Sequence, residues 1–355
     1  MLPYFGGGLF VKRFPFLDWM RGLAVVIMIQ CHVFNSFARM DVREGGPYVL
    51  SQFVGGMAAP LFLFMAGMTF AFHLDSLARR EPNRWRRWRF SLRRAAYILG
   101  IAFLFRFTNW LASLPHSDLG EITKVDILNC MGVGIAAVSW AALFEFKGRV
   151  RFAVLAGLAI AAAAPILTNL PWGGTPALVQ EYLVPGPGRP RFAFFPCASY
   201  VGFGLATGAI VKRTAADRLD RLMQWSVAIG FALVFTAQYF SNLPYSIYPK
   251  SDFWRDSPAL ILIRVGIMLL MMVGAYLWTE FGMGTTWSWM LCFGKTSLMV
   301  YWVHVMLVYG DLAKPFKRAL SIPQTVLATL LVMVSMVALA AARLWWQARR
   351  AEPRT

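Results

Sequence analysis

A run of apolar blocks, separated by short segments rich in arginine, proline or glycine, occupies most of this sequence. A helix of about 20 apolar residues crosses the ~30 Å hydrocarbon core of a bilayer. Blocks of this length predict helices that satisfy their own backbone groups inside lipid. We therefore expect an all-α fold, a polytopic transmembrane helical bundle of about ten spans. The predicted spans are 16–38, 49–72, 95–114, 125–145, 150–170, 192–211, 222–241, 258–281, 289–310 and 322–346.

The basic residues gather between the apolar blocks. The formal net charge is +18, and the densest basic run lies in 75–94, which we predict as an arginine-rich loop. Because basic loops stay in the cytoplasm, this loop and both termini are predicted to be cytoplasmic, with external loops at 171–191 and 241–257. The loop near 282–288, also inside in this topology, carries no lysine or arginine. Residues 1–355 are predicted to form a single integral-membrane domain.

This distribution of charge also predicts partners. We expect anionic lipids to contact the arginine-rich loop. We expect no nucleic-acid partner, because the chain has no soluble basic domain to bind one. No metal is expected either, since the cysteines lack metal-ligand spacing and no HExxH signature is present. The four cysteines lie in or beside apolar blocks, at Cys31, Cys130, Cys197 and Cys292.

The first predicted span carries four polar residues on one face. At 100° per residue, Arg21 and His32 lie within about 20° of each other. Asp18 and Asn35 lie close to the same line. A charge in a span costs roughly 2.5–3.5 kcal/mol on insertion scales, so such a row faces protein or a wet cavity and usually has a function. We expect Asp18 to pair with Arg21, and His32 to serve as a general base or a nucleophile.

The ninth predicted span repeats this arrangement. Lys295 precedes His304, and Ser297 and Tyr301 lie on or near the histidine's face. In each of these two spans the histidine lies deeper than the cation, by about 16 Å and about 13 Å at 1.5 Å per residue. This suits an anionic cofactor that enters from the cytoplasm with its reactive end inward. The structural alternative is that the Lys295 side chain only extends to the membrane interface and that His304 only forms a hydrogen bond with a neighbouring residue.

Three other features predict packing. Arg106 and Asp126 are expected to form a structural ion pair between neighbouring spans. Pro60 is expected to kink the second span in mid-membrane. Gly204 and Gly208 have the small-xxx-small spacing of closely packed helices.

Together these segments resemble the bacterial membrane acyltransferases related to heparan-α-glucosaminide N-acetyltransferase, in the wider acyltransferase-3-like group. The first two motifs are the most specific. The segments that carry the resemblance are Leu17-Asp18-x-x-Arg21-Gly22-Leu with His32, Ala59-Pro60-Leu-Phe-Leu-Phe-Met-Ala-Gly67, Asp126-Ile-Leu-Asn-Cys-Met-Gly132, Phe195-Pro196 to Gly208, Trp254 to Gly266, and Gly294-Lys295-x-Ser297 to His304.

The resemblance implies an enzyme of the bacterial inner membrane. It would move an acyl group, commonly acetyl, from cytoplasmic acyl-CoA to an amine or hydroxyl of an extracytoplasmic, sugar-like acceptor. The loop from Arg39 to Tyr48 lacks the histidine expected from the mammalian enzyme, so an acetyl-histidine relay and direct transfer with His32 as base both stay open. A homodimer is compatible with the sequence. The expected catalytic residues are His32, Asp18 and His304, and the expected cofactor-binding residues are Arg21, Lys295 and Asn35.

Two other classes of protein fit parts of the pattern. A multi-pass transporter or flippase without covalent chemistry would also have about ten spans and buried charges, but paired broken helices are not evident in the sequence. A scaffold in an envelope-polymer assembly would tolerate the loss of His32. Transfer of a labelled acetyl group to an acceptor separates the enzyme from both.

Overall fold

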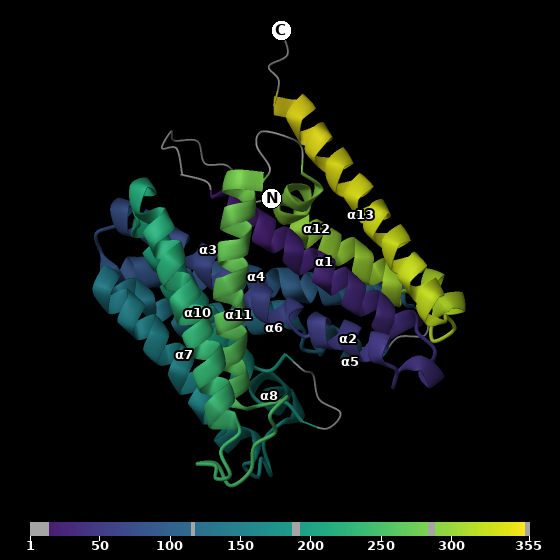
Figure 1. Ribbon diagram of the computed structural model, residues 1–355, viewed down its shortest axis with the longest axis horizontal. Coiled ribbons are helices and arrows are strands. Elements are labelled where there is room, and N and C mark those ends of the chain that lie inside the picture. Colours follow the sequence, from purple (N-terminus) through teal and green to yellow (C-terminus); the bar gives the residue numbers. More distant parts are fainter. Residues whose placement is uncertain (1–13, 115–117, 187–191, 283–287, 352–355) are drawn as a thin grey trace.

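The computed structural model describes residues 14–114, 118–186, 192–282 and 288–351, whose regular structure is helical apart from an isolated bridge between Ala38 and Leu320 (Figure 1). Within these residues, 9 segments are long and apolar enough to cross a membrane, so the predicted polytopic helical fold is confirmed. The helices are α1 Pro15–Phe37, α2 Gly46–Gly55, α3 Ala58–Arg80, α4 Arg84–Ala112, α5 Gly120–Thr123, α6 Ile127–Val138, α7 Phe146–Thr168, α8 Ala177–Leu183, α9 Phe194–Arg213, α10 Leu219–Ser241, α11 Pro258–Leu277, α12 Trp289–Tyr309 and α13 Ile322–Ala351.

The second predicted span, 49–72, consists of two helices. Helix α2 ends at Gly55 and α3 begins at Ala58. A Cβ at Gly55 would lie 2.4 Å from the Cys31 Sγ, so the glycine lets α2 pack directly on α1. Pro60 falls in the first turn of α3, where its missing N–H breaks no helical hydrogen bond. The second span is therefore interrupted just before Pro60, by a break between two helices and not by a kink within one.

The fourth predicted span, 125–145, is shorter than the others. Its apolar helix covers Ile127–Leu143, which corresponds to about 25 Å at 1.5 Å per residue, and its last turn is a 3₁₀ helix. The Asp126 carboxylate accepts hydrogen bonds from the backbone N–H groups of Leu128 and Asn129 at 2.9 and 3.2 Å. The Asn129 side chain accepts from the Asp126 N–H in return. This capping box explains where α6 begins.

The basic segments meet at one end of the bundle, where α1, α4 and α12 begin and α3, α9 and α13 end. We call it the basic end. The expected loop 75–94 is instead helical except at 81–83, because α3 and α4 extend through it. Arg213 Nε lies 3.3 Å from Asp75 Oδ1, which links α9 to α3. The predicted orientation partly rests on residues outside the described part of the chain. These are Lys12, Arg13 and most of the 282–288 loop.

Helices α1 and α12 run side by side, with α13 along their flank and α7 and α10 on the other side of the bundle (Figure 1). Two glycines permit this approach. A Cβ at Gly22 would lie 2.1 Å from the Met290 carbonyl oxygen, and one at Gly294 would lie 1.8 Å from the Asp18 carbonyl oxygen. Since no other residue fits this contact, these glycines fix the register between α1 and α12.

Helices α3 and α9 also pack closely through glycine. A Cβ at Gly204 would lie 1.9 Å from the Phe64 carbonyl oxygen, and one at Gly208 would lie 2.5 Å from the Met68 Cα. The predicted small-xxx-small contact is confirmed, and its partner is α3.

We predict that Gly294→Val destabilises the protein by more than about 1–3 kcal/mol, because the new side chain must push α12 away from α1. Thermal unfolding of the detergent-solubilised protein measures the effect. Gly274→Val in α11 is the matched control, since a Cβ at Gly274 has no neighbour within 4 Å. Equal unfolding temperatures for the two variants would contradict the close contact between α1 and α12.

Candidate active site

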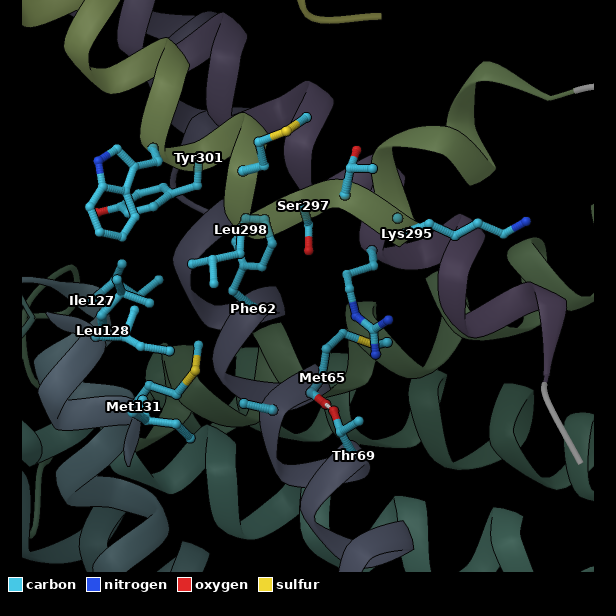
Figure 2. A pocket seen from close by; sticks show the side chains of 18 of the residues that line it. Phe62, Met65, Thr69, Ile127, Leu128, Met131, Lys295, Ser297, Leu298 and Tyr301 are labelled. Carbon is cyan, nitrogen blue, oxygen red and sulfur yellow. Dashed lines mark hydrogen bonds between the residues drawn. The ribbon is translucent and has the colours of Figure 1, made fainter. Parts of the chain in front are cut away.

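A pocket of about 740 Å³ lies among helices α1, α3, α4, α6, α12 and α13. Met65 and Thr69 of α3 line one side, and Ser297 and Tyr301 of α12 line the facing side (Figure 2). This volume lies within the range of about 300–1,000 Å³ typical of small-molecule and cofactor sites. The helices that carry the predicted polar rows therefore border a space large enough for a ligand.

Cations collect where the pocket meets the basic end. Arg21, Arg94, Lys295 and Arg343 line it, and no acidic residue is among the described lining residues. Arg21 Nη1 donates to Asp18 Oδ1 at 3.0 Å, so the predicted pair is confirmed. Lys295 is exposed, and its side chain extends away from the other labelled lining residues (Figure 2). The local electrostatics favour an anionic ligand.

The remainder of the pocket is largely apolar. One and two turns after Arg94, α4 presents Ile98 and Ile101 to it, and α6 contributes Leu128. Tyr301 lines this part, and its ring packs against Phe105 with centroids 4.9 Å apart. The pocket thus combines a cationic end with an apolar interior, as a site for an amphipathic ligand requires.

The structure brings the two predicted histidines together. His32 Nδ1 of α1 lies 2.9 Å from His304 Nε2 of α12, and their rings stack with an interplanar angle of 13°. His304 is fully buried, whereas His32 is partly buried. Neither is among the described lining residues, but Tyr301 lines the pocket and packs 5.9 Å from the His304 ring. Met28, one turn before His32, also lines it.

The hydrogen bonds of this pair assign the proton positions. His304 Nδ1 lies 2.7 Å from the Val300 carbonyl oxygen, which can only accept, so Nδ1 carries a proton. In neutral His304 the other nitrogen, Nε2, then accepts a hydrogen bond, and His32 Nδ1–H donates it. His32 Nε2 consequently keeps its lone pair. A histidine held in this way is oriented to act as a base.

Asn35, expected to bind the cofactor together with Arg21 and Lys295, lies apart from them. Its Nδ2 donates to the Tyr309 hydroxyl at 3.4 Å, and Asn35 is exposed outside the pocket lining. The Tyr309 ring packs edge-on against His32, with centroids 5.5 Å apart. These two side chains therefore lie on the side of His32 that faces away from the basic end.

Asp18 lies far from the histidines. It is fourteen residues from His32 along α1, which corresponds to about 21 Å at 1.5 Å per residue. Its role in the structure is to hold Arg21 at the pocket. Asp18 and His32, expected to act together as catalytic residues, thus lie toward opposite ends of α1.

The predicted ion pair between neighbouring helices is present. Arg106 Nε lies 3.3 Å from Asp126 Oδ2, and both side chains are largely buried. Asn129 donates to the Tyr182 hydroxyl at 2.9 Å, which extends the network to α8. Because Asp126 also caps α6, the pair joins the end of α4 to the start of the short helix that lines the pocket.

Sequence reasoning missed Arg343 and Gln347, which bring α13 into the pocket lining. The signal was present, since Arg343 lies inside the last apolar block, and a charge in such a block usually has a partner or a function. Arg94 had been noticed only as part of a basic run.

The bundle defines a polytopic membrane protein, and its pocket combines a cationic end with a largely apolar interior. The chain belongs to the heparan-alpha-glucosaminide N-acetyltransferase catalytic family, whose sequence model matches residues 13–248. This family uses acetyl-CoA as acetyl donor, which identifies the chain as a membrane acetyltransferase. The match covers α1 to α10, so Lys295, His304 and Arg343 lie beyond the matched part. No curated protein was found to match the chain.

We predict that Arg106→Met destabilises the protein by about 3–5 kcal/mol, because it leaves the Asp126 carboxylate buried without its counter-charge. Adding Asp126→Asn to this variant should restore much of the loss, since asparagine is neutral and caps a helix as well as aspartate does. Unfolding temperatures of the single and double variants measure this recovery. A double variant less stable than Arg106→Met would show that the ion pair is not the reason.

Proposed function

We propose that this protein transfers an acetyl group across the bacterial inner membrane, from cytoplasmic acetyl-CoA to an amine or hydroxyl of an extracytoplasmic, sugar-like acceptor. Residues 1–355 act in this proposal as one integral-membrane domain. The observation that carries the proposal is the hydrogen bond between His32 and His304, which lies next to the apolar part of a pocket whose other end is cationic.

The pocket supports acetyl-CoA as the donor. Its cationic end suits the phosphates of CoA, and its apolar interior suits the extended arm that carries the thioester. With the basic end in the cytoplasm, as the positive-inside rule favours, the donor enters from inside. The acetyl group then lies near Tyr301 and Met28, which border the histidine pair.

The proton positions support His32 as the general base. His32 Nε2 removes the proton from the acceptor nitrogen or oxygen as that atom attacks the thioester carbonyl carbon. The carbon–sulfur bond then breaks, and the CoA thiolate leaves with the proton that His32 returns. Both the proton and the acetyl group are accounted for in this direct transfer. An acetyl-histidine relay would use the same nitrogen as nucleophile, and acetyl labelling of the protein without acceptor separates the two routes.

The far side of His32 supports an acceptor that arrives from outside. Asn35 is exposed there, and the Tyr309 ring lies against His32. An aromatic ring beside an amide offers a sugar both a stacking surface and hydrogen bonds. In this proposal Asn35 binds the acceptor, whereas Arg21 and Lys295 bind the donor.

We predict that His32→Gln lowers the rate of acetyl transfer to D-glucosamine, used as an amine probe, by about 10²–10⁴-fold, since the base is lost. Binding of labelled acetyl-CoA should stay unchanged. His304→Gln should retain more activity than His304→Leu, because the glutamine oxygen still accepts the hydrogen bond from His32.

Thr236→Val is the control, since the Thr236 hydroxyl is exposed and donates only to the Ala232 carbonyl of its own helix. Full turnover by His32→Gln would rule out His32 as the general base. Equal rates for the two His304 variants would rule out a role of His304 in positioning His32.

We predict that acetyl-CoA supports transfer only from the membrane face that holds the basic end. The protein is reconstituted in vesicles that contain D-glucosamine, and labelled acetyl-CoA is added outside. A cleavable carboxyl-terminal tag scores the orientation of each molecule. Labelled N-acetylglucosamine should accumulate inside in proportion to the molecules whose tag is outside. Glucosamine released unchanged would instead indicate a transporter.

A further inference from the structure

The four cations of the pocket differ in how they are neutralised. Arg21 already contacts the Asp18 carboxylate at 3.0 Å. Lys295 is exposed and extends away from the other labelled lining residues (Figure 2). Neither Lys295 nor Arg94 nor Arg343 forms an ion pair with any described residue. Unlike Lys295, the two arginines are also partly buried, so solvent compensates their charge less.

Arg343 lies near the end of α13, in contact with the pocket but far along the chain from its other lining residues. Within the described part of the chain its guanidinium makes no hydrogen bond, although the residue is only partly exposed. Gln347, one helical turn further on, lines the pocket beside it. A half-buried guanidinium that faces a pocket without a carboxylate is complementary to a phosphate ligand.

The two arginines differ in the lining residues that their own helices contribute. Beyond Arg94, α4 presents the apolar Ile98 and Ile101 to the pocket. Among the described lining residues α13 contributes only the polar Arg343 and Gln347, so it borders no apolar part of the pocket. In a CoA thioester the diphosphate follows the apolar arm, and the 3′-phosphate of the adenosine comes last. The position of Arg94 beside the apolar lining suits the diphosphate, and the polar surroundings of Arg343 suit the terminal phosphate.

We propose that Arg343 binds the 3′-phosphate of the donor, so that the pocket selects CoA thioesters over thioesters that lack this phosphate. This inference rests on the proposed function, since it assumes that the pocket holds the donor. It makes α13 a part of the donor site, although α13 lies outside the matched family segment.

The test measures equilibrium binding of acetyl-CoA, acetyl-dephospho-CoA and acetyl-pantetheine to the full-length protein in neutral phosphatidylcholine nanodiscs at fixed salt. The wild-type protein should bind acetyl-CoA about 10- to 100-fold more tightly than acetyl-dephospho-CoA, as expected for a charged hydrogen bond. Arg343→Gln should bind both within about twofold of each other, at the wild-type affinity for acetyl-dephospho-CoA. Arg94→Gln should weaken both equally and leave acetyl-pantetheine unchanged.

Two further variants serve as a control and as a conservative substitution. Arg349→Gln is the matched control, because Arg349 is on the same helix but is exposed and stacks on Trp345 at 3.9 Å. It should leave every affinity unchanged. Arg343→Lys keeps the charge but loses the two-pronged donor, so it should retain part of the discrimination and also serves if Arg343→Gln does not fold.

Each outcome decides the proposal. The assignment would be overturned if Arg343→Gln kept the wild-type ratio of affinities for acetyl-CoA and acetyl-dephospho-CoA. It would also be overturned if Arg349→Gln lost as much affinity for acetyl-CoA as Arg343→Gln. Either result would leave the donor pocket itself intact. Binding of none of the three thioesters by the wild-type protein would instead overturn the proposed function. An effect of Arg343→Gln that appears only when phosphatidylglycerol is added would assign Arg343 to a lipid headgroup and reject the 3′-phosphate.

Discussion

The close contact between α1 and α12 determines the rest of this site. Gly22 and Gly294 leave no space between the two backbones, so each turn of α1 has a fixed partner on α12. One end of the contact therefore holds Arg21 at the pocket, and the other brings His32 within hydrogen-bonding distance of His304. Because glycine contributes no side chain to bury, shape complementarity alone sets this register. The chemistry of the site depends on a contact between atoms that take no part in it.

The polar groups inside the bundle are arranged so that few charges remain without a partner. Arg106 faces Asp126, Arg21 faces Asp18, and the histidines bond to each other. In a low-dielectric interior an unpaired polar group costs several kcal/mol, so these pairs are what the bundle requires. Among the described residues, Arg94, Lys295 and Arg343 line the pocket without an ion pair, and Arg264 of α11, beside Tyr200, is a further cation of this kind outside it. A ligand of opposite charge would neutralise the cations of the pocket.

The sequence predicted what periodicity and charge can determine, but not what depends on distant contacts. The polar face of α1 follows from helical geometry, and the pair of Asp18 and Arg21 follows from their spacing. The contact between His32 and His304 joins residues 272 positions apart, and no local pattern encodes it. The break between α2 and α3 was missed because Gly55 is needed only where α1 packs against it. Arg343 was missed because α13 reaches the pocket by tertiary packing.

A second histidine as the orienting partner of the base suits a site inside a membrane. A carboxylate in the place of His304 would hold His32 in the same tautomer, but it would add a buried negative charge with a large desolvation cost. Neutral His304 accepts the same hydrogen bond and donates its own Nδ1–H to the Val300 carbonyl oxygen, which needs no counter-charge. In the proposed reaction, the positive charge on His32 would therefore have no counter-charge beside it and would be short-lived. Such a base returns its proton quickly to the departing thiolate, which favours direct transfer over a long-lived charged intermediate.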